Sequence, residues 1–433
     1  MCGVGALLTP ILGVAGYIGH YTIGPERQWW AASINQLGIR YSYSLALLTA
    51  VGMALHWQNL NFGKSFFTRQ EKFVLAFLGI VWLSWALGSE TVGRYSGVVD
   101  HPTVKFTKVI IFAMMMSHVV TNLKNLDWLL WIFVLGAMIL GMEAYSEPRI
   151  AFAQGRLNNV GGSDFSEANS LAAYLAAMLP IIAVQFLRSG WMGKGICLVA
   201  GVFATNAIVL TRSRGAVIGI VTGLLTALIL SPAKHRGKII VGLVVLIIGG
   251  IYLADPQFIN RISTISTSED ERDYSAQSRI EIWQGGIKMF LDNPLGVGPG
   301  NFYQNIGRYA DKHHHRDAHN AYIRCACELG VLGIVTFSAL IIYALVFFRR
   351  IIKQIRELPR SAQDQLVLTS FAFAVSLAVL IGSSITMTLL YMEGLWWILI
   401  MPACLQRAME NIKTDLTSPA EPVSPKQRRQ VGK

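Results

Sequence analysis

Twelve apolar runs divide the chain, and each is long enough to form a membrane-spanning helix. They lie at residues 3–20, 41–57, 73–88, 106–121, 127–143, 168–187, 192–210, 215–231, 238–254, 320–348, 365–387 and 389–406. Hydrophobic residues make up 53% of the chain and charged residues only 14%, whereas a soluble chain has about 25% charged residues. We therefore predict an all-α polytopic membrane protein with about 12 transmembrane helices.

A long polar segment, residues 255–318, separates the ninth run from the tenth. Apolar residues recur with helical spacing between Ile280 and Phe290, which predicts an amphipathic helix that ends at the glycines and prolines of 293–300. This helix is expected to lie on the bundle or on the membrane interface, with its apolar face down. The predicted organisation is helices 1–9 in residues 1–254, a partly helical loop subdomain in 255–318, helices 10–12 in 319–407, and a tail in 408–433. The Pro, Ser, Lys and Arg content of the tail indicates disorder.

Lysines and arginines gather in alternate connections between the runs. The clusters are Lys64, Arg69 and Lys72; Arg188 and Lys194; Lys234, Arg236 and Lys238; Arg349, Arg350, Lys353, Arg356 and Arg360; and Lys426, Arg428, Arg429 and Lys433. Because basic loops stay in the cytoplasm, both termini are expected to be cytoplasmic and the 255–318 loop external. The formal charge of +12 follows from this topology and requires no nucleic-acid partner.

An arginine pair, Arg212 and Arg214, lies between two apolar runs, where charge is costly. The long loop ends in His319 and Asn320, at the start of the tenth run. Together these residues predict an anion-handling site on one face of the membrane. The simpler alternatives are arginines that reach phospholipid headgroups and a histidine that only caps a helix. The histidine run 313–315 is expected to be a solvated loop stretch.

Four short motifs follow one another in the second half of the chain. They are Ser213-Arg214-Gly215; Ser278-Arg279 with Trp283; Asn293-Pro294-Leu295-Gly296-Val297-Gly298-Pro299-Gly300-Asn301-Phe302; and His319-Asn320, followed after nine residues by Gly330-Val331-Leu332-Gly333. In this order they resemble the O-antigen ligase and polymerase superfamily, most strongly over residues 155–350. The His-Asn, nine residues, Gly-x-x-Gly pattern is the ligase motif of that superfamily.

The resemblance implies an O-antigen ligase, a metal-independent glycosyltransferase without a cofactor at the periplasmic face of the bacterial inner membrane. Such an enzyme of lipopolysaccharide biosynthesis moves a glycan from an undecaprenyl-diphosphate carrier to a sugar hydroxyl of lipid A-core. Its implied partners are these two lipid-linked substrates and membrane lipids. The family's functional arginines correspond to Arg214 and Arg279, and its histidine to His319. The region before the sixth helix lines the site in the family, which adds Arg156 and Asn169 as candidate contacts to the glycan or diphosphate.

The chemistry of these side chains agrees with that assignment. A departing diphosphate carries charge, and the planar fork of arginine binds phosphate oxygens in a bidentate way, so Arg214 and Arg279 are the predicted clamp. A neutral imidazole can take a proton from the acceptor hydroxyl near neutral pH, so His319 is the predicted base of an inverting transfer. Two further residues are predicted to bind substrate. Arg212 is included because it lies close to Arg214 in the sequence, and Asn320 because it follows His319.

Three other functions remain open. A polymerase or a protein O-glycan ligase would belong to the same superfamily, whereas a transporter or flippase for lipid-linked oligosaccharides belongs to a different class. A transporter predicts internal repeats and charges deep in the helices, but here the charges cluster at one face beside the external loop. No Asp-x-Asp motif or other carboxylate cluster predicts a metal site. Gly330 and Gly333 are expected to allow close helix packing and not to take part in chemistry.

Overall fold

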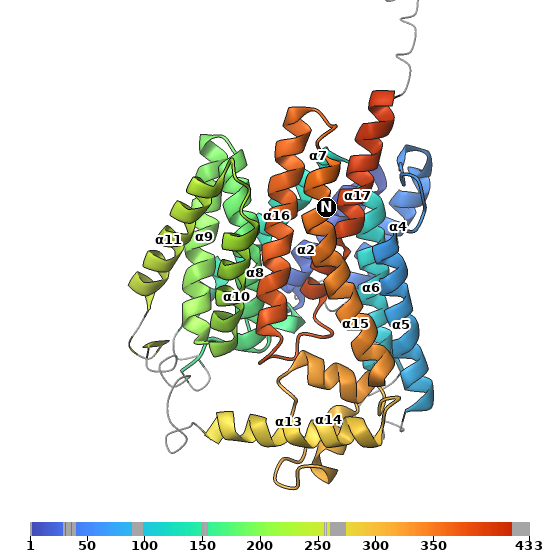
Figure 1. Ribbon diagram of the computed structural model, residues 1–433, viewed down its shortest axis with the longest axis vertical. Helices are drawn as coiled ribbons and strands as arrows, with labels where there is room; N and C mark the ends of the chain where they lie inside the picture. The colour runs from blue at the N-terminus through green and yellow to red at the C-terminus, as the bar shows by residue number, and fades with distance from the viewer. Residues whose placement is uncertain are drawn as a thin grey trace, which may run out of the picture.

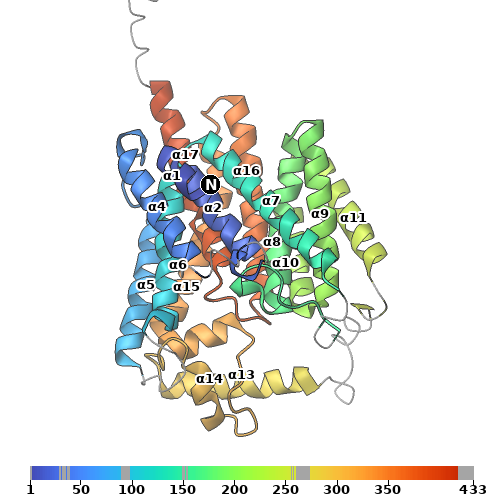
Figure 2. The same cartoon turned by 180° about the vertical axis from the view of Figure 1, so that it is seen from behind.

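The computed structural model describes residues 2–28, 31, 36, 40–88, 98–148, 152, 155–254, 256, 258–259 and 274–417. Within these residues the secondary structure is helical, with no strand. The α-helices are α1 (Cys2–Leu8), α2 (Pro10–Ile23), α4 (Tyr41–Leu55), α5 (Arg69–Leu87), α6 (Pro102–Val119), α7 (Leu123–Ser146), α8 (Ala168–Arg188), α9 (Trp191–Thr211), α10 (Arg214–Leu230), α11 (Arg236–Leu253), α13 (Tyr274–Asp292), α14 (Phe302–Asn305), α15 (Ala321–Gln354), α16 (Arg360–Ser383) and α17 (Glu393–Thr417). Most of them form one bundle, with α13 lying across one end (Figures 1 and 2).

Each predicted apolar run coincides with helical structure, which confirms the all-α membrane class. Seven helices in the described residues are long and apolar enough to cross a membrane, namely α5, α7, α8, α9, α11, α15 and α16. The first run forms two helices, because α2 begins anew at Pro10 with Thr9 as its extended N-cap. Helices α4 and α10 are apolar but shorter, with 15 and 17 residues. The predicted count of about 12 transmembrane helices is thus larger than the seven helices of the described residues that are long and apolar enough to cross a membrane.

The centre of the bundle is built from α8 and α16. In their most apolar windows, 72% of α8 and 89% of α16 is buried, against 6% of α11. Glycines of α10 allow close contact with α16, since a Cβ on Gly219 would lie 2.1 Å from the Ser383 hydroxyl oxygen and one on Gly223 would lie 2.5 Å from Val379. Helix α11 lies at the edge of the bundle (Figure 1), where its apolar side chains are suited to contact lipid.

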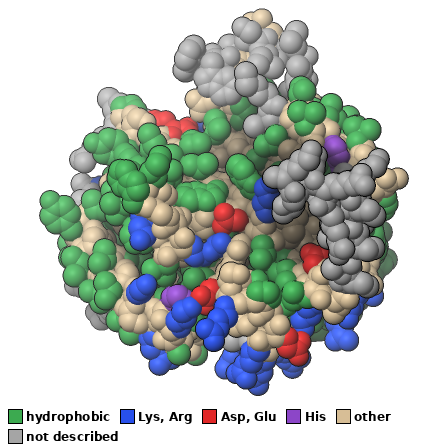
Figure 3. Space-filling model, turned by 90° about the horizontal axis from the view of Figure 1, so that it is seen from above, with side chains coloured by type: hydrophobic (Ala, Val, Ile, Leu, Met, Phe, Trp, Pro, Cys, Tyr) green, Lys and Arg blue, Asp and Glu red, His purple; other side chains and the backbone are tan. Residues whose placement is uncertain are grey.

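The end of the bundle opposite α13 carries basic residues. Lys234, in the turn before α11, pairs with Asp364 of α16, and Lys413 of α17 lies 3.1 Å from Glu357. Figure 3 looks onto this end and shows lysine and arginine side chains gathered along one border of the face. The structure therefore places these basic residues and α13 at opposite ends of the bundle, while the orientation of the bundle in a membrane remains a prediction.

Helix α17 continues to Thr417, beyond the predicted end of the last helix at residue 407. Its polar end has partners, because Asn411 donates to the carbonyl oxygens of Asn61 at 3.0 Å and Thr121 at 2.9 Å. Residues 408–417 are thus helical, which corrects the predicted boundary of the disordered tail, and the rest of that tail lies outside the described residues. Composition could not reveal these long-range contacts.

Helix α15 is broken at Gly330, whose φ of 66° and ψ of −163° are essentially confined to glycine. The segment 293–300 docks onto the break through backbone hydrogen bonds. These run from Val297 to Cys327 at 2.9 Å, from Gly298 to Glu328 at 3.0 Å, and from Val331 to Pro294 at 2.9 Å. The two glycine-containing motifs therefore build one joint, which turns the first part of α15 across the end of the bundle (Figure 1).

Candidate functional site

The backbone at His319 is strained and firmly anchored. Its φ is 45°, in the left-handed region that few non-glycine residues adopt. Three hydrogen bonds hold this segment: from Trp283 Nε1 to the Ala318 carbonyl at 2.8 Å, from the His319 amide to Asp317 Oδ2 at 3.2 Å, and from the Ala321 amide to the Ser384 carbonyl at 2.9 Å. Strain of this kind persists only where neighbours enforce it, and it gathers at functional sites.

Asn320 caps α15. Its side-chain Oδ1 accepts hydrogen bonds from the amides of Tyr322 at 2.9 Å and Ile323 at 3.0 Å, and the residue is buried. Capping satisfies amides that the first turn of a helix leaves without partners. The structure thus gives Asn320 a structural role and adds no support to its predicted contact with substrate.

A cavity of about 180 Å³ brings His319 and Arg279 together. Its lining consists of Ser278, Arg279, Ile282, His313, Arg316, Asp317 and His319. The arginines and histidines among them supply hydrogen-bond donors suited to an anion. The predicted base and one predicted clamp residue therefore meet at a single cavity.

Burial and neighbouring charges set the protonation of His319 and Asp317, which both line the cavity. Burial lowers the pKa of His319 below its ordinary value; Arg279 and Arg316 lower it further, while Asp317 and Glu167 act in the opposite direction. Burial alone would raise the pKa of Asp317, but its positive neighbours and a hydrogen bond from a threonine outweigh this and hold that pKa below its usual range. The cavity therefore places a neutral imidazole beside an ionised carboxylate at neutral pH.

Arg212 forms the turn between α9 and α10. It closes α9 in the left-handed conformation, with a φ of 50°, and its guanidinium donates to the carbonyl oxygen of Gly155. The turn between α9 and α10 lies at the same end of the bundle as α13 (Figure 1). Part of the hydrogen-bonding capacity of Arg212 is thus used to fasten the segment before α8 to the turn.

Arg156 and Asn169 fasten the same turn from its other side. Arg156 donates through Nε to the Thr211 carbonyl at 2.9 Å and through Nη2 to Asn169 Oδ1 at 2.7 Å. The Ser213 hydroxyl donates to the same Asn169 oxygen at 3.0 Å. Hydrogen bonds therefore connect Arg156 and Asn169, two predicted contact residues, to the turn between α9 and α10.

Arg214 is the first residue of α10 and is half-buried. Ser213 caps this helix by accepting a hydrogen bond from the Ala216 amide at 3.3 Å. The next residue, Gly215, lies against the connection between α16 and α17, because a Cβ there would stand 2.4 Å from the hydroxyl oxygen of Thr386.

Residues 384–388, in the first part of that connection, contact both the start of α10 and the loop that carries His319. The Ser384 carbonyl oxygen accepts a hydrogen bond from the Ala321 amide, and the Thr388 hydroxyl donates a hydrogen bond to the carboxylate of Asp317. The start of α10 with Arg214 and the loop with His319 are therefore attached to one short segment.

A charged network beneath the cavity was not predicted. Arg324 Nε lies 2.9 Å from Glu328 Oε1, its Nη1 lies 3.3 Å from Asp317 Oδ1, and the Tyr391 hydroxyl donates to Glu328 Oε2 at 2.8 Å. The sequence did contain a signal, since Arg324 and Glu328 are an i,i+4 charge pair inside the tenth apolar run. It could not show that the pair reaches a carboxylate next to the histidine.

The histidine run 313–315 is solvated only in part. His314 and His315 are exposed, as expected. His313 is buried instead, with its Nε2 2.7 Å from Glu281 Oε2, so the prediction was wrong for this residue. The partner lies on α13, and this contact between distant segments could not be read from the loop.

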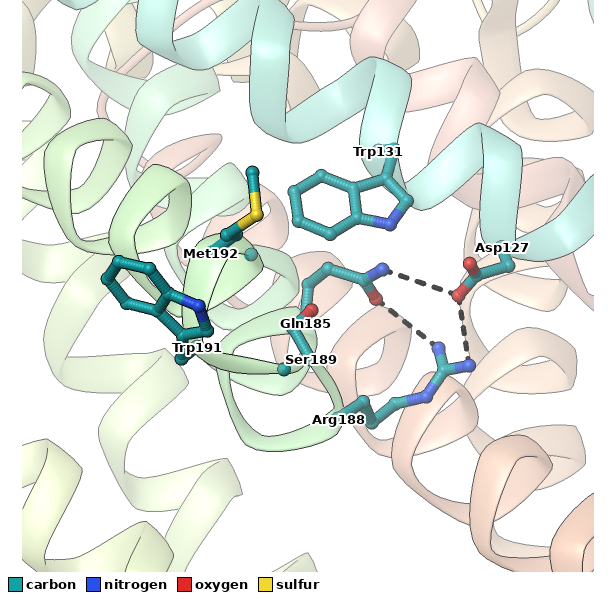
Figure 4. A pocket seen from close by; sticks show the side chains of 9 residues that line it. Asp127, Trp131, Gln185, Arg188, Ser189, Trp191 and Met192 are labelled. Atoms are coloured by element: carbon teal, nitrogen blue, oxygen red, sulfur yellow. Dashed lines mark hydrogen bonds and ion pairs between the residues drawn. The ribbon is translucent and has the colours of Figure 1, made fainter.

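A larger hollow of about 520 Å³ lies at the opposite end, where α7 begins and α8 turns into α9. Its lining consists of Asp127, Trp131, Gln185, Arg188, Ser189, Gly190, Trp191, Met192 and Gly193. Figure 4 shows Arg188 turned toward Asp127, at 2.9 Å, and toward Gln185, at 3.3 Å. Because these polar groups bind one another and no predicted site residue lines it, this hollow is not the candidate site.

No group of three or more His, Cys, Asp or Glu side chains is placed to hold a metal ion in the part of the chain that the structure describes.

Residues 199–338 match the family model described as O-antigen ligase. The matching segment contains Arg214, Arg279 and His319, and it confirms the resemblance to the O-antigen ligase and polymerase superfamily. No curated protein matches the chain.

Proposed function

We propose that this membrane protein of the O-antigen ligase and polymerase superfamily is an O-antigen ligase. It would transfer a glycan from undecaprenyl diphosphate to a sugar hydroxyl of lipid A-core, at the periplasmic face of the inner membrane. The family match supports a ligase-type or polymerase-type function. The choice of ligase, both substrates, the location and the independence from metal ions are the proposal.

The observation that carries the proposal is the shared cavity of Arg279 and His319, on the family-matching segment and at the end of the bundle covered by α13. Glycosyl transfer needs a cation near the departing diphosphate and a base near the attacking hydroxyl. A guanidinium and an imidazole on one cavity meet both needs without a metal ion.

The reaction then proceeds in one displacement. The acceptor oxygen forms a bond to the anomeric carbon while the bond from that carbon to the diphosphate oxygen breaks. The hydroxyl proton passes to His319, and the charge on the leaving diphosphate is met by Arg279 and Arg214. Direct attack of this kind inverts the anomeric centre.

The test is a transfer assay with the purified full-length protein, an undecaprenyl-diphosphate-linked glycan and lipid A-core. His319→Ala is compared with wild type, and His314→Ala, an exposed histidine of the same loop, serves as the matched control. Transfer by wild type and the control, but not by His319→Ala, is the expected result. Elongation of the donor on itself would indicate a polymerase, and no turnover of the donor by wild type would favour transport.

A further inference from the structure

We propose that Asp317 is a positioning residue that holds the imidazole of His319 in the orientation needed to take a proton from the acceptor hydroxyl. This inference rests on the proposed function of His319 as the base. It concerns a residue outside the sequence motifs of the site, and its evidence is the set of contacts around one carboxylate.

The carboxylate of Asp317 contacts both the backbone and the ring of the histidine. Its Oδ2 accepts a hydrogen bond from the His319 amide at 3.2 Å and lies 3.7 Å from His319 Nδ1. The separation from the ring is longer than a hydrogen bond, but catalytic hydrogen bonds are often long without substrate and shorten in the complex. Asp317 thus faces one particular ring nitrogen.

The same carboxylate is fixed from two other elements. The Thr388 hydroxyl donates to Oδ2, and Arg324 Nη1 lies 3.3 Å from Oδ1. Arg324 is itself held by Glu328, whose other oxygen accepts the Tyr391 hydroxyl. Because both oxygens have partners on α15 and on the connection before α17, the carboxylate cannot turn away from the histidine without breaking this network.

A fixed carboxylate selects the tautomer of the ring. In a neutral imidazole one nitrogen carries the proton and the other accepts one. A proton on Nδ1, facing Asp317, leaves Nε2 as the acceptor. When the hydroxyl proton reaches Nε2, the imidazolium that forms lies beside a negative charge that stabilises it.

The charged groups with the largest effects on the pKa of His319 give the inference a measurable consequence. They are Asp317, Arg279 of α13, Glu167 at the start of α8, and Arg316. Asp317 has the largest effect among these charges, and it raises the pKa of His319 against the effect of burial. Replacing the carboxylate by an amide should therefore lower the pKa of the histidine.

The first experiment measures the protonation of His319 directly, without catalysis. The full-length protein is modified with diethylpyrocarbonate, which reacts with neutral imidazole, at a series of pH values. Trypsin cleavage after Arg316 and Arg324 releases the peptide 317–324, in which His319 is the single histidine. Mass spectrometry of this peptide gives a titration midpoint for that residue alone.

Asp317→Asn should lower this midpoint by roughly one pH unit, the size expected for loss of a neighbouring charge. Asp311→Asn, at an exposed position of the same loop, should leave it unchanged. Thr388→Val keeps the charge but removes one anchor of the carboxylate, so it provides a second variant if Asp317→Asn does not fold. Thr388→Val should lower the midpoint by less than Asp317→Asn does.

The second experiment measures transfer. Asp317→Asn should lower kcat by at least about 10-fold with KM within about twofold, and shift the acidic limb of the kcat profile to lower pH. An unchanged midpoint for His319, or a loss confined to KM or to the amount of folded protein, would overturn the positioning role. If wild type shows no transfer while the midpoint shifts as expected, the proposed function fails and the pairing of the two side chains stands.

Discussion

At the residue scale, the cavity brings the half-buried imidazole of His319 together with the guanidinium groups of Arg279 and Arg316. Burial and the two arginines beside the cavity lower the pKa of His319, and Asp317 limits that effect. A base with a depressed pKa stays deprotonated, and so able to accept a proton, to lower pH than an ordinary histidine. Arg279, which would bind the diphosphate, thus also favours the neutral form of the proposed base.

This predicts the acidic limb of the pH profile. The active form is the neutral imidazole, so kcat/KM should fall as the pH drops through the lowered pKa of His319, with a midpoint below about 6.5. The measurement is kcat/KM for glycan transfer across the pH range in which the protein stays folded. A midpoint well above 7 would contradict a neutral, buried His319 as the base.

The clamp assignment predicts a difference between two substitutions of Arg279. Arg279→Ala should reduce kcat for transfer by about 10²-fold or more, because a preorganised cation near the leaving group is lost. Arg279→Lys should recover little of this, because an ammonium group lacks the bidentate fork. Arg308→Ala, at an exposed arginine of the same loop, is the control, and full activity in Arg279→Ala would remove this residue from the clamp.

At the scale of elements, the joint between the 293–300 segment and the break in α15 fastens the segment that follows α13 to α15. The existence of the helices could be predicted, because apolar runs of this length have few alternatives. The break could not, since apolar residues continue on both sides of Gly330. Gly330 was expected to allow close helix packing; it is instead the residue at which the helix changes direction.

The joint predicts a large effect of one added methyl group. A Cβ on Gly330 would lie 2.3 Å from the Pro294 carbonyl oxygen, and the backbone conformation there disfavours any side chain. Gly330→Ala should therefore destabilise the protein by at least about 1–3 kcal/mol. Thermal unfolding in detergent measures this as a lower Tm.

Gly249→Ala is the matched control for that variant. Gly249 lies in α11, where an added Cβ meets nothing within 4 Å. A helical glycine replaced by alanine should gain up to about 1 kcal/mol, so the Tm should stay the same or rise. Equal Tm values for the two variants would mean that the joint is not strained as the structure indicates.

At the scale of the whole molecule, long-range polar contacts hold together segments that are far apart in the sequence, and these contacts are what the sequence could not predict. Arg279 and His319 were identified by their family motifs, and the structure places them at one cavity. Asp317 was missed because its anchor, Thr388, lies on another connection. At the basic end, the fully buried Arg407 of α17 binds Glu71 of α5 through two contacts of 2.6 and 2.7 Å.

This buried pair predicts a non-additive response. Arg407→Met should destabilise the protein by about 3–5 kcal/mol, because it leaves the Glu71 carboxylate buried without its partner. The double variant Arg407→Met with Glu71→Gln should be more stable than the single one, since no unpaired charge remains. Lys413→Met, which removes the exposed pair with Glu357, should cost less than about 1 kcal/mol. The measurement is unfolding in detergent. If the double variant loses as much stability as the two single substitutions added together, the pairing of Arg407 with Glu71 is contradicted.

The separation of the two ends predicts how the protein lies in the membrane. The basic clusters favour the cytoplasm, so the end covered by α13 should face the periplasm, where the proposed acceptor would reach the cavity. With Cys2 replaced by serine, the four cysteines that remain are buried, and a cysteine can be placed at exposed His314 or exposed Lys353. A membrane-impermeant maleimide added to intact cells with a permeabilised outer membrane should label His314→Cys and spare Lys353→Cys until the inner membrane is opened. The reverse pattern would put the cavity in the cytoplasm, away from any periplasmic acceptor, and would exclude the proposed ligase even if every helix were placed correctly.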